Sequence, residues 1–95
     1  MVSISHLSMI KMLTIIDLRE DIAEYINKHG LSGKWGKAKT LFETNPFHPS
    51  LNTELLEPRH RLIYSFRVDR QYRALFIYLP NNTVEILAVT KHYRK

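Results

Sequence analysis

Three largely apolar stretches in the last third of the chain, of which the first alternates apolar and polar residues, predict consecutive β-strands over 61–68, 72–79 and 83–90. The first stretch places Phe66 on one face and Arg67 on the other. Only short polar segments separate the stretches, and turns of this kind join antiparallel neighbours. We therefore expect a sheet with one apolar face and one face that carries arginines.

The basic residues are concentrated in the same region. Residues 59–95 hold eight basic residues against two acids, a net charge of +6, whereas residues 1–58 have a net charge of −1. Arginine is costly to place in the middle of a small sheet unless a partner neutralises it. Because a phosphate suits its planar fork of donors, the charge pattern indicates an acidic partner, either nucleic acid or acidic protein.

The first half of the chain predicts one strand and two helices. Residues 9–16 are apolar and β-branched, which is typical of a strand. Asp17 is the candidate N-cap of the first helix, and Gly30 its candidate end. A second helix is expected from Ser32, which would cap it, to Asn45, which precedes a proline.

These elements predict an α+β fold of order β-α-α-β-β-β. A helical hairpin packs on one face of a four-stranded, mainly antiparallel sheet, and residues 46–60 form a loop between the two halves. A chain of 95 residues can bury one core, so one domain is expected to span residues 1–95. The positions expected in that core are Ile22, Ile26, Trp35, Leu41, Tyr64 and Phe66.

The composition argues against several classes of site. The chain has no cysteine, and hence no disulfide and no thiolate metal site. Its acids and histidines lack the spacing of metal ligands, and its three glycines form no phosphate-binding loop. No apolar run approaches the roughly 18 residues of a membrane span. We therefore expect no cofactor, metal, signal peptide or membrane contact, and a cytoplasmic location.

Three segments carry a family pattern: 45–51, 64–76, and 84–89 with the basic and aromatic tail after it. Over residues 10–93 the sequence resembles the RelE/ParE superfamily of bacterial toxins. That superfamily includes ribosome-dependent messenger-RNA endonucleases and also gyrase inhibitors without nuclease activity, so the resemblance leaves the activity open.

The terminal His92-Tyr93 pair favours the YoeB-like nuclease branch. The resemblance implies that Arg73 contacts the scissile phosphate, that His92 protonates the leaving 5′-oxygen and that Tyr93 orients the substrate. It also implies that Arg67 holds a second phosphate oxygen and that Glu54 is the general base on the 2′-hydroxyl. The cleavage would need no metal. The catalytic arginine and histidine are expected on the open face of the sheet, where truncating them would change stability little.

Each of these residues also has a structural interpretation. Arg73 could pair with Asp69 or with a loop carbonyl, and Arg67 could be a solvated strand residue. Glu54 could be a plain surface carboxylate, and the terminal residues a frayed basic tail. His48 is expected to pack or cap its loop rather than to catalyse.

The nuclease branch implies the toxin of a type II toxin–antitoxin pair that cleaves messenger RNA on the ribosome. Its partners would be a small antitoxin, the ribosome and the message. Further basic residues would bind ribosomal RNA: Arg61, Arg70, Lys91, Arg94 and Lys95. The alternatives are a ParE-like inhibitor of DNA gyrase without catalysis, and a degenerate member that only binds its antitoxin.

Overall fold

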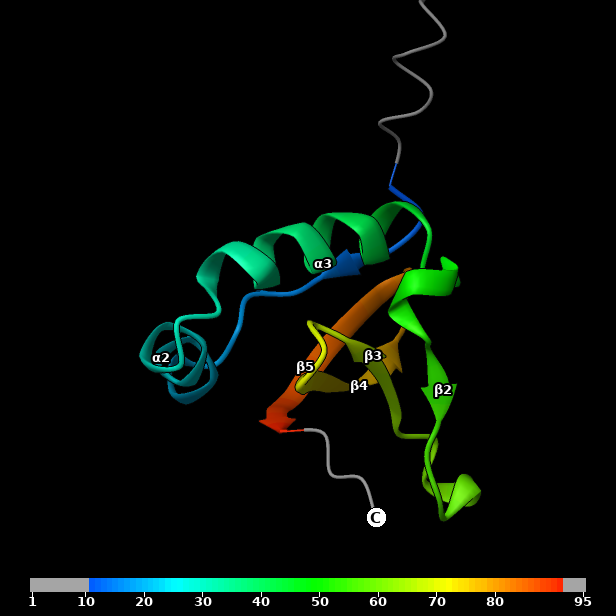
Figure 1. Cartoon of the computed structure of the whole chain (residues 1–95). Coiled ribbons are helices and arrows are strands. Elements are labelled where there is room, and N and C mark those ends of the chain that lie inside the picture. The colour runs from blue at the N-terminus through cyan, green and yellow to red at the C-terminus, as the bar shows by residue number, and fades with distance from the viewer. Residues whose placement is uncertain (1–10, 92–95) are drawn as a thin grey trace, which may run out of the picture.

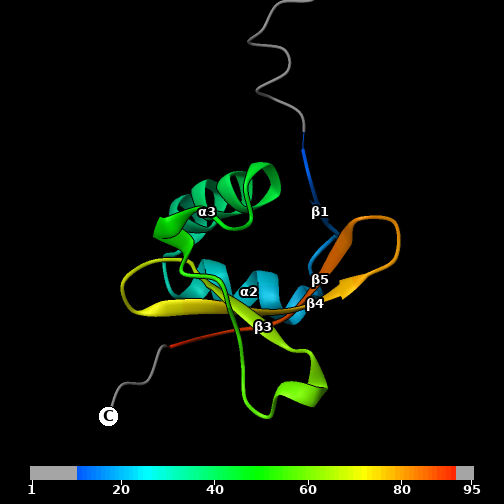
Figure 2. The same cartoon turned by 90° about the vertical axis from the view of Figure 1, so that its right-hand side faces the viewer.

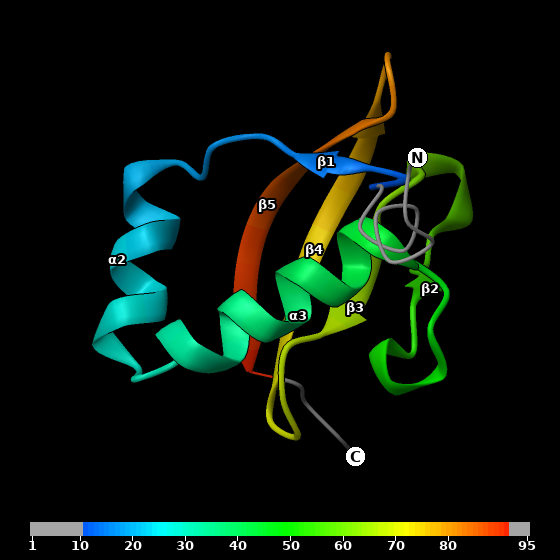
Figure 3. The same cartoon turned by 90° about the horizontal axis from the view of Figure 1, so that it is seen from above.

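The computed structural model describes residues 11–91, in which helices α2 and α3 lie on one face of a mixed sheet (Figures 1 and 3). The helices span Glu20–Lys28 (α2) and Ser32–Thr44 (α3). The strands are Thr14–Ile15 (β1), Glu54–Leu55 (β2), Tyr64–Arg67 (β3), Tyr72–Leu79 (β4) and Thr83–Lys91 (β5). Two 3-10 helices, Pro49–Leu51 (η1) and Arg59–Arg61 (η2), lie in the connection between α3 and β3. No helix within residues 11–91 has the length and apolar character needed to cross a membrane.

The strands of residues 11–91 follow the order β1-β5-β4-β3-β2. β1 runs parallel to β5, and the other neighbouring pairs are antiparallel. The β4–β5 hairpin turns through Asn81 and Asn82, whose positive φ angles of 65° and 57° suit asparagine in a tight turn. The predicted α+β architecture is confirmed, with the correction that the described residues form five strands rather than four.

The additional strand is β2, which lies in a segment that the sequence predicted to be a loop. Its two residues pair with Ser65 and Tyr64 of β3. β3 is in turn shorter than the predicted 61–68, because Arg59–Arg61 form η2 and Leu62 adopts a left-handed conformation with φ 55°. The boundaries predicted for β4 are confirmed, and β5 extends one residue beyond its prediction.

The helix ends differ in detail from the predictions. The N-cap of α2 is Arg19 and not Asp17, and no side chain caps this end. α2 ends just before Gly30, whose φ of 66° requires the left-handed region that glycine tolerates. Ser32 is the first residue of α3 rather than its cap, and Asn45 ends that helix as predicted. The predicted first strand is reduced to β1, and residues 9 and 10 lie outside the described chain.

The core lies between the helices and the sheet. Phe66 stacks on Phe42 with ring centroids 4.5 Å apart and on Trp35 at 6.0 Å. Phe76 meets the edge of Phe42 at 5.0 Å. The predicted core is confirmed, because Ile22 and Ile26 join this buried cluster and the other two predicted residues pack against it while partly exposed: Leu41 and Tyr64.

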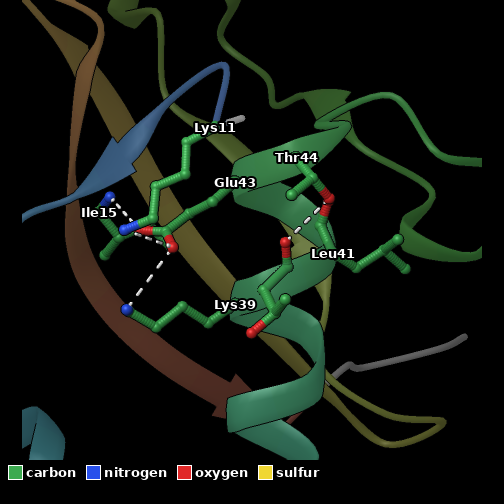
Figure 4. A network of polar contacts seen from close by, with 7 residues as sticks. Lys11, Ile15, Lys39, Leu41, Glu43 and Thr44 are labelled. Atoms are coloured by element: carbon green, nitrogen blue, oxygen red, sulfur yellow. Dashed lines mark hydrogen bonds and ion pairs between the residues drawn. The ribbon is translucent and has the colours of Figure 1, made fainter. Parts of the chain in front are cut away.

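A buried carboxylate ties β1 to α3 (Figure 4). Glu43 Oε2 accepts a hydrogen bond of 2.8 Å from the Ile15 backbone N–H. Its Oε1 lies 3.4 Å from Lys11 Nζ and 3.7 Å from Lys39 Nζ. The Glu43 carbonyl also accepts the Met12 N–H at 2.7 Å. Glu43 therefore adds to the two backbone hydrogen bonds, from Thr14 to Asn82 and from Ile16 to Val84, that hold this short parallel strand at the edge of the sheet.

Truncating Phe66 should test the core directly. Phe66 is fully buried between three aromatic rings, so Phe66→Ala should lower the free energy of unfolding by roughly 3–5 kcal/mol. The matched control Phe47→Ala removes a ring that is 71% exposed and should change it by no more than about 0.5 kcal/mol. Urea denaturation measures both, and equal losses would contradict this packing.

Candidate functional site

The face of the sheet opposite the helices contains a hollow of about 400 Å³. It draws residues from β2, β3, β4 and β5, and from the residue after β2. Figure 2 shows the connection between α3 and β3 reaching past the sheet to the side away from the helices. The lining residues are Glu54, Leu56, Ser65, Arg73, Leu75, Thr90 and Lys91.

The strand register explains how these side chains meet. Glu54 lies opposite Ser65, and Ser65 lies opposite Leu75 on β4. Arg73 lies between Arg67 on β3 and Thr90 on β5. Directly opposed residues in antiparallel strands share a face, so a carboxylate and two guanidinium groups gather on one side of the sheet.

Arg73 is held firmly in this hollow. Its Nε donates a hydrogen bond of 2.9 Å to Ser65 Oγ, and its Nη2 donates one of 2.7 Å to the Asn52 carbonyl. Nη2 also lies 3.4 Å from Glu54 Oε2. Asn52 adopts a left-handed conformation with φ 47° at the end of η1. Arg73 is only 6% exposed, and buried polar groups need such partners.

This geometry corrects one expectation and selects between two others. Arg73 lies on the open face as predicted, but its side chain is buried there instead of exposed. Of the two structural partners considered, the loop carbonyl is the one present. Asp69 has other partners: it accepts the Gln71 and Tyr72 N–H groups at 2.8 Å each and Lys34 Nζ at 3.2 Å.

The electrostatics of the hollow favour an anion. Burial lowers the pKa of the Arg73 guanidinium from its ordinary value, and the positive charge of Arg67 lowers that pKa further while Glu54 opposes both. Arginine nevertheless stays protonated in proteins. The hollow therefore has two cations in its lining, Arg73 and Lys91, against one carboxylate, Glu54, whose side chain is 50% exposed. Arg67 adds a further positive charge beside Arg73. A phosphate entering the hollow would neutralise the remaining positive charge.

The structure brings together part of the predicted site. Glu54, Arg73 and Lys91 line the same hollow, and Arg67 is the cross-strand neighbour of Arg73. The predicted residues His92, Tyr93, Arg94 and Lys95 lie outside the described residues. β5 ends at Lys91 beside the start of β4, since Lys91 is paired with Tyr72.

The other predicted basic residues lie elsewhere. Arg61 belongs to η2 and lines a separate hollow with Tyr64 and Tyr78. Arg70 is in the β3–β4 turn, near Arg67. The interpretation of His48 as a loop cap is confirmed, because its Nδ1 accepts the Ser50 N–H at 3.1 Å.

Sequence reasoning missed the two residues that hold Arg73. Ser65 lies two residues before Arg67 and therefore on the same face of the strand, opposite to Phe66. This position was the one signal in the sequence that Ser65 lies near Arg73. Asn52 contributes a backbone carbonyl, for which a sequence has no signature. Within residues 11–91, no three side chains of the histidine, cysteine, aspartate or glutamate type cluster as metal ligands would.

Arg73 should contribute to stability, contrary to what the sequence suggested. Arg73→Ala removes hydrogen bonds from a charged donor to Ser65 and Asn52 and leaves both acceptors in the hollow. We expect the free energy of unfolding to fall by about 1.5–3 kcal/mol. The control Arg59→Ala removes an exposed arginine and should stay within about 0.5 kcal/mol. Chemical denaturation that finds Arg73→Ala as stable as the control would contradict the contacts described.

The sequence matches no protein-family model and no curated protein. Solved structures do resemble the chain. A "YoeB/ParE toxin from Agrobacterium tumefaciens" is 17% identical with a TM-score of 0.62, and covers 85% of this chain and 98% of its own. A "YoeB-YefM complex from Staphylococcus aureus" is 18% identical at a TM-score of 0.61, with coverage of 85% and 98%.

A third structure, a copper-bound mutant toxin from Helicobacter pylori, is 15% identical with a TM-score of 0.61 and covers 85% of this chain and 96% of its own. These identities are low, yet the match extends over nearly the whole of each toxin chain. This chain has the fold of the YoeB/ParE toxins.

Proposed function

We propose that this chain is the toxin of a type II toxin–antitoxin pair and cleaves messenger RNA on the ribosome. The observation that carries the proposal is the meeting of Glu54 with Arg73, at 3.4 Å, in a hollow on the open face of the sheet. A carboxylate and a guanidinium are the groups needed to accept a proton and to neutralise charge on a phosphate. The fold shared with a YoeB–YefM complex supports an antitoxin as partner.

The proposed reaction is an internal transesterification. The 2′-hydroxyl of one nucleotide attacks the adjacent phosphorus while Glu54 takes its proton. Arg73 and Arg67 neutralise the negative charge that grows on the phosphorane oxygens. The bond from phosphorus to the 5′-oxygen then breaks, and His92 protonates that oxygen. Tyr93 orients the substrate, and the products are a 2′,3′-cyclic phosphate and a 5′-hydroxyl.

The contacts of Arg73 suit this role. Within residues 11–91 they involve Nε and Nη2, so the plane of the guanidinium is set by Ser65 and Asn52. Nη1 then remains for a phosphate oxygen. Donors that are oriented before the reaction need no reorganisation when charge develops, which is the main source of such electrostatic catalysis.

Docking on the ribosome would use basic residues from the second half of the chain. Lys91 lines the hollow, and Arg61, Arg70, Arg94 and Lys95 would add contacts to ribosomal RNA phosphates. Phosphate contacts of this kind position a protein without reading sequence. A small antitoxin would cover the same face, and the reaction belongs in the cytoplasm, where ribosomes translate messages.

A second candidate is a gyrase inhibitor without catalysis. The hydrogen bonds from Arg73 to Ser65 and Asn52 are compatible with it, since a purely structural arginine would make them too. The two functions differ in the target that is damaged, which an experiment in cells can separate.

The test is expression of the chain without its antitoxin, followed by primer extension on translated messages. The native chain should stop growth and produce discrete cuts. Glu54→Gln should lower the cleavage rate roughly 10²–10⁴-fold by removing the base, and His92→Ala should do the same by removing the acid. Arg73→Lys should lower it roughly 10²–10³-fold because an ammonium cannot reproduce the oriented fork.

Glu57→Gln is the matched control, because it neutralises a nearby carboxylate that is 78% exposed, and it should remain toxic. Circular dichroism should confirm that every variant is folded. If Glu54→Gln and His92→Ala still arrest growth while messages stay intact and DNA supercoiling fails, the gyrase proposal replaces the nuclease proposal.

A further inference from the structure

A second hollowed surface lies beside the first, between α3 and the β3–β4 turn. Figure 3 shows this turn, in yellow, emerging from beneath α3. One hollow of about 250 Å³ and another of about 720 Å³ share Lys34, Ser50 and Arg67 in their linings. We call the combined surface the α3 groove. Its walls carry Lys34, Lys37, Ser50, Arg67, Asp69 and Arg70.

The charge of the α3 groove is strongly positive. Four cationic side chains line it, and the single acid is Asp69. Burial would raise the pKa of Asp69, but hydrogen bonds from the Gln71 N–H, Lys34 and the Tyr72 N–H outweigh it and lower that pKa. The carboxylate is therefore ionised and already occupied. Within residues 11–91, no acid forms an ion pair with Lys37, Arg67 or Arg70.

The floor of the groove is apolar. It consists of Ala38 and Leu41 from α3, with Leu51 from η1 and Val68 after β3. Lys34 and Lys37 are three residues apart and so lie on the same side of α3, above this floor. Cationic walls over an aliphatic floor match a nucleotide, which has a charged phosphate on one side and a flat base and ribose on the other.

The α3 groove and the hollow of Glu54 and Arg73 are linked by a pair of neighbouring arginines. Arg67 lines the groove, and it is also the cross-strand neighbour of Arg73. One arginine therefore stands between the two surfaces. A polyanion that places one phosphate at Arg73 would pass Arg67 and then meet Lys37 or Arg70.

We infer that the α3 groove binds the phosphodiester backbone of single-stranded RNA, with Lys37 and Arg70 as phosphate ligands for nucleotides next to the one held at Arg73. This inference rests on the proposed function. The position of Arg67, in the lining of the groove and opposite Arg73, favours RNA over an acidic protein segment, because one RNA strand could reach both surfaces. The groove adds residues of α3 to a basic surface that the sequence assigned to residues 59–95 alone.

The test is binding of a fluorescent single-stranded RNA oligonucleotide with 2′-O-methyl riboses, followed by anisotropy over a range of salt. The modified ribose cannot attack its phosphate, so binding is measured apart from cleavage. Lys37→Gln and Arg70→Gln should each weaken binding roughly twofold to fivefold, as expected for one exposed ion pair. Each should also reduce the log–log salt slope by about 0.7.

The matched control is Lys28→Gln, which removes one positive charge from the exposed end of α2 and should change neither value. Groove variants that behave like Lys28→Gln would overturn the inference. An oligoglutamate peptide is the second probe: if its binding depends on Lys37 and Arg70 while RNA binding does not, the groove takes an acidic protein segment instead.

The outcome is separable from that of the proposed function. If the variants lose RNA binding as expected but the native chain cuts no message in cells, the groove is supported and the nuclease proposal fails. If the native chain cuts messages and the groove variants bind like the control, the groove alone is wrong.

Discussion

The guanidinium of Arg73 is the point on which the open face of the sheet depends. A charged group buried in a small sheet must find partners within the fold, and here they come from two segments. Ser65 is supplied by β3, and the Asn52 carbonyl and Glu54 by the connection after η1. These contacts hold that connection against the sheet, where β2 pairs with β3 and becomes the edge strand. The same contacts place a carboxylate beside a cation in a hollow. The feature that stabilises this face therefore also brings together the groups that the proposed reaction would use.

The two faces of the sheet follow different rules. The helix face is apolar and closed: Phe42, Phe66 and Phe76 fill it, and Glu43 fastens the edge strand to α3. The open face keeps cations that the fold only partly neutralises. Because β3 and β4 carry both faces, each inward aromatic residue fixes the position of an outward polar neighbour. The arrangement of Glu54 and Arg73 on the open face therefore rests on the packing of the helix face.

Apolar runs bounded by turn residues made most of the fold predictable, and local backbone geometry accounts for what was not. β4 was predicted at its observed bounds because an apolar run ends at an asparagine turn. β2 was not predicted, since a strand of two residues shows no alternation of side chains and forms only because β3 lies beside it. The meeting of Glu54 with Arg73 agrees with the family resemblance, whereas the Asn52 carbonyl depends on a φ of 47°. Lys34 and Lys37 were overlooked because only the packing of α3 brings them to Arg67.

The most direct test of the account is the chemistry of the cut ends. Purified native chain would be added to ribosomes translating a defined message, and the fragments analysed for their termini. Attack by the 2′-hydroxyl, with Glu54 as base and Arg73 neutralising the phosphorane, predicts a 2′,3′-cyclic phosphate on one fragment and a 5′-hydroxyl on the other. Fragments with a 5′-phosphate would require a water nucleophile, and an intact message would mean no nuclease at all; either result would contradict the account.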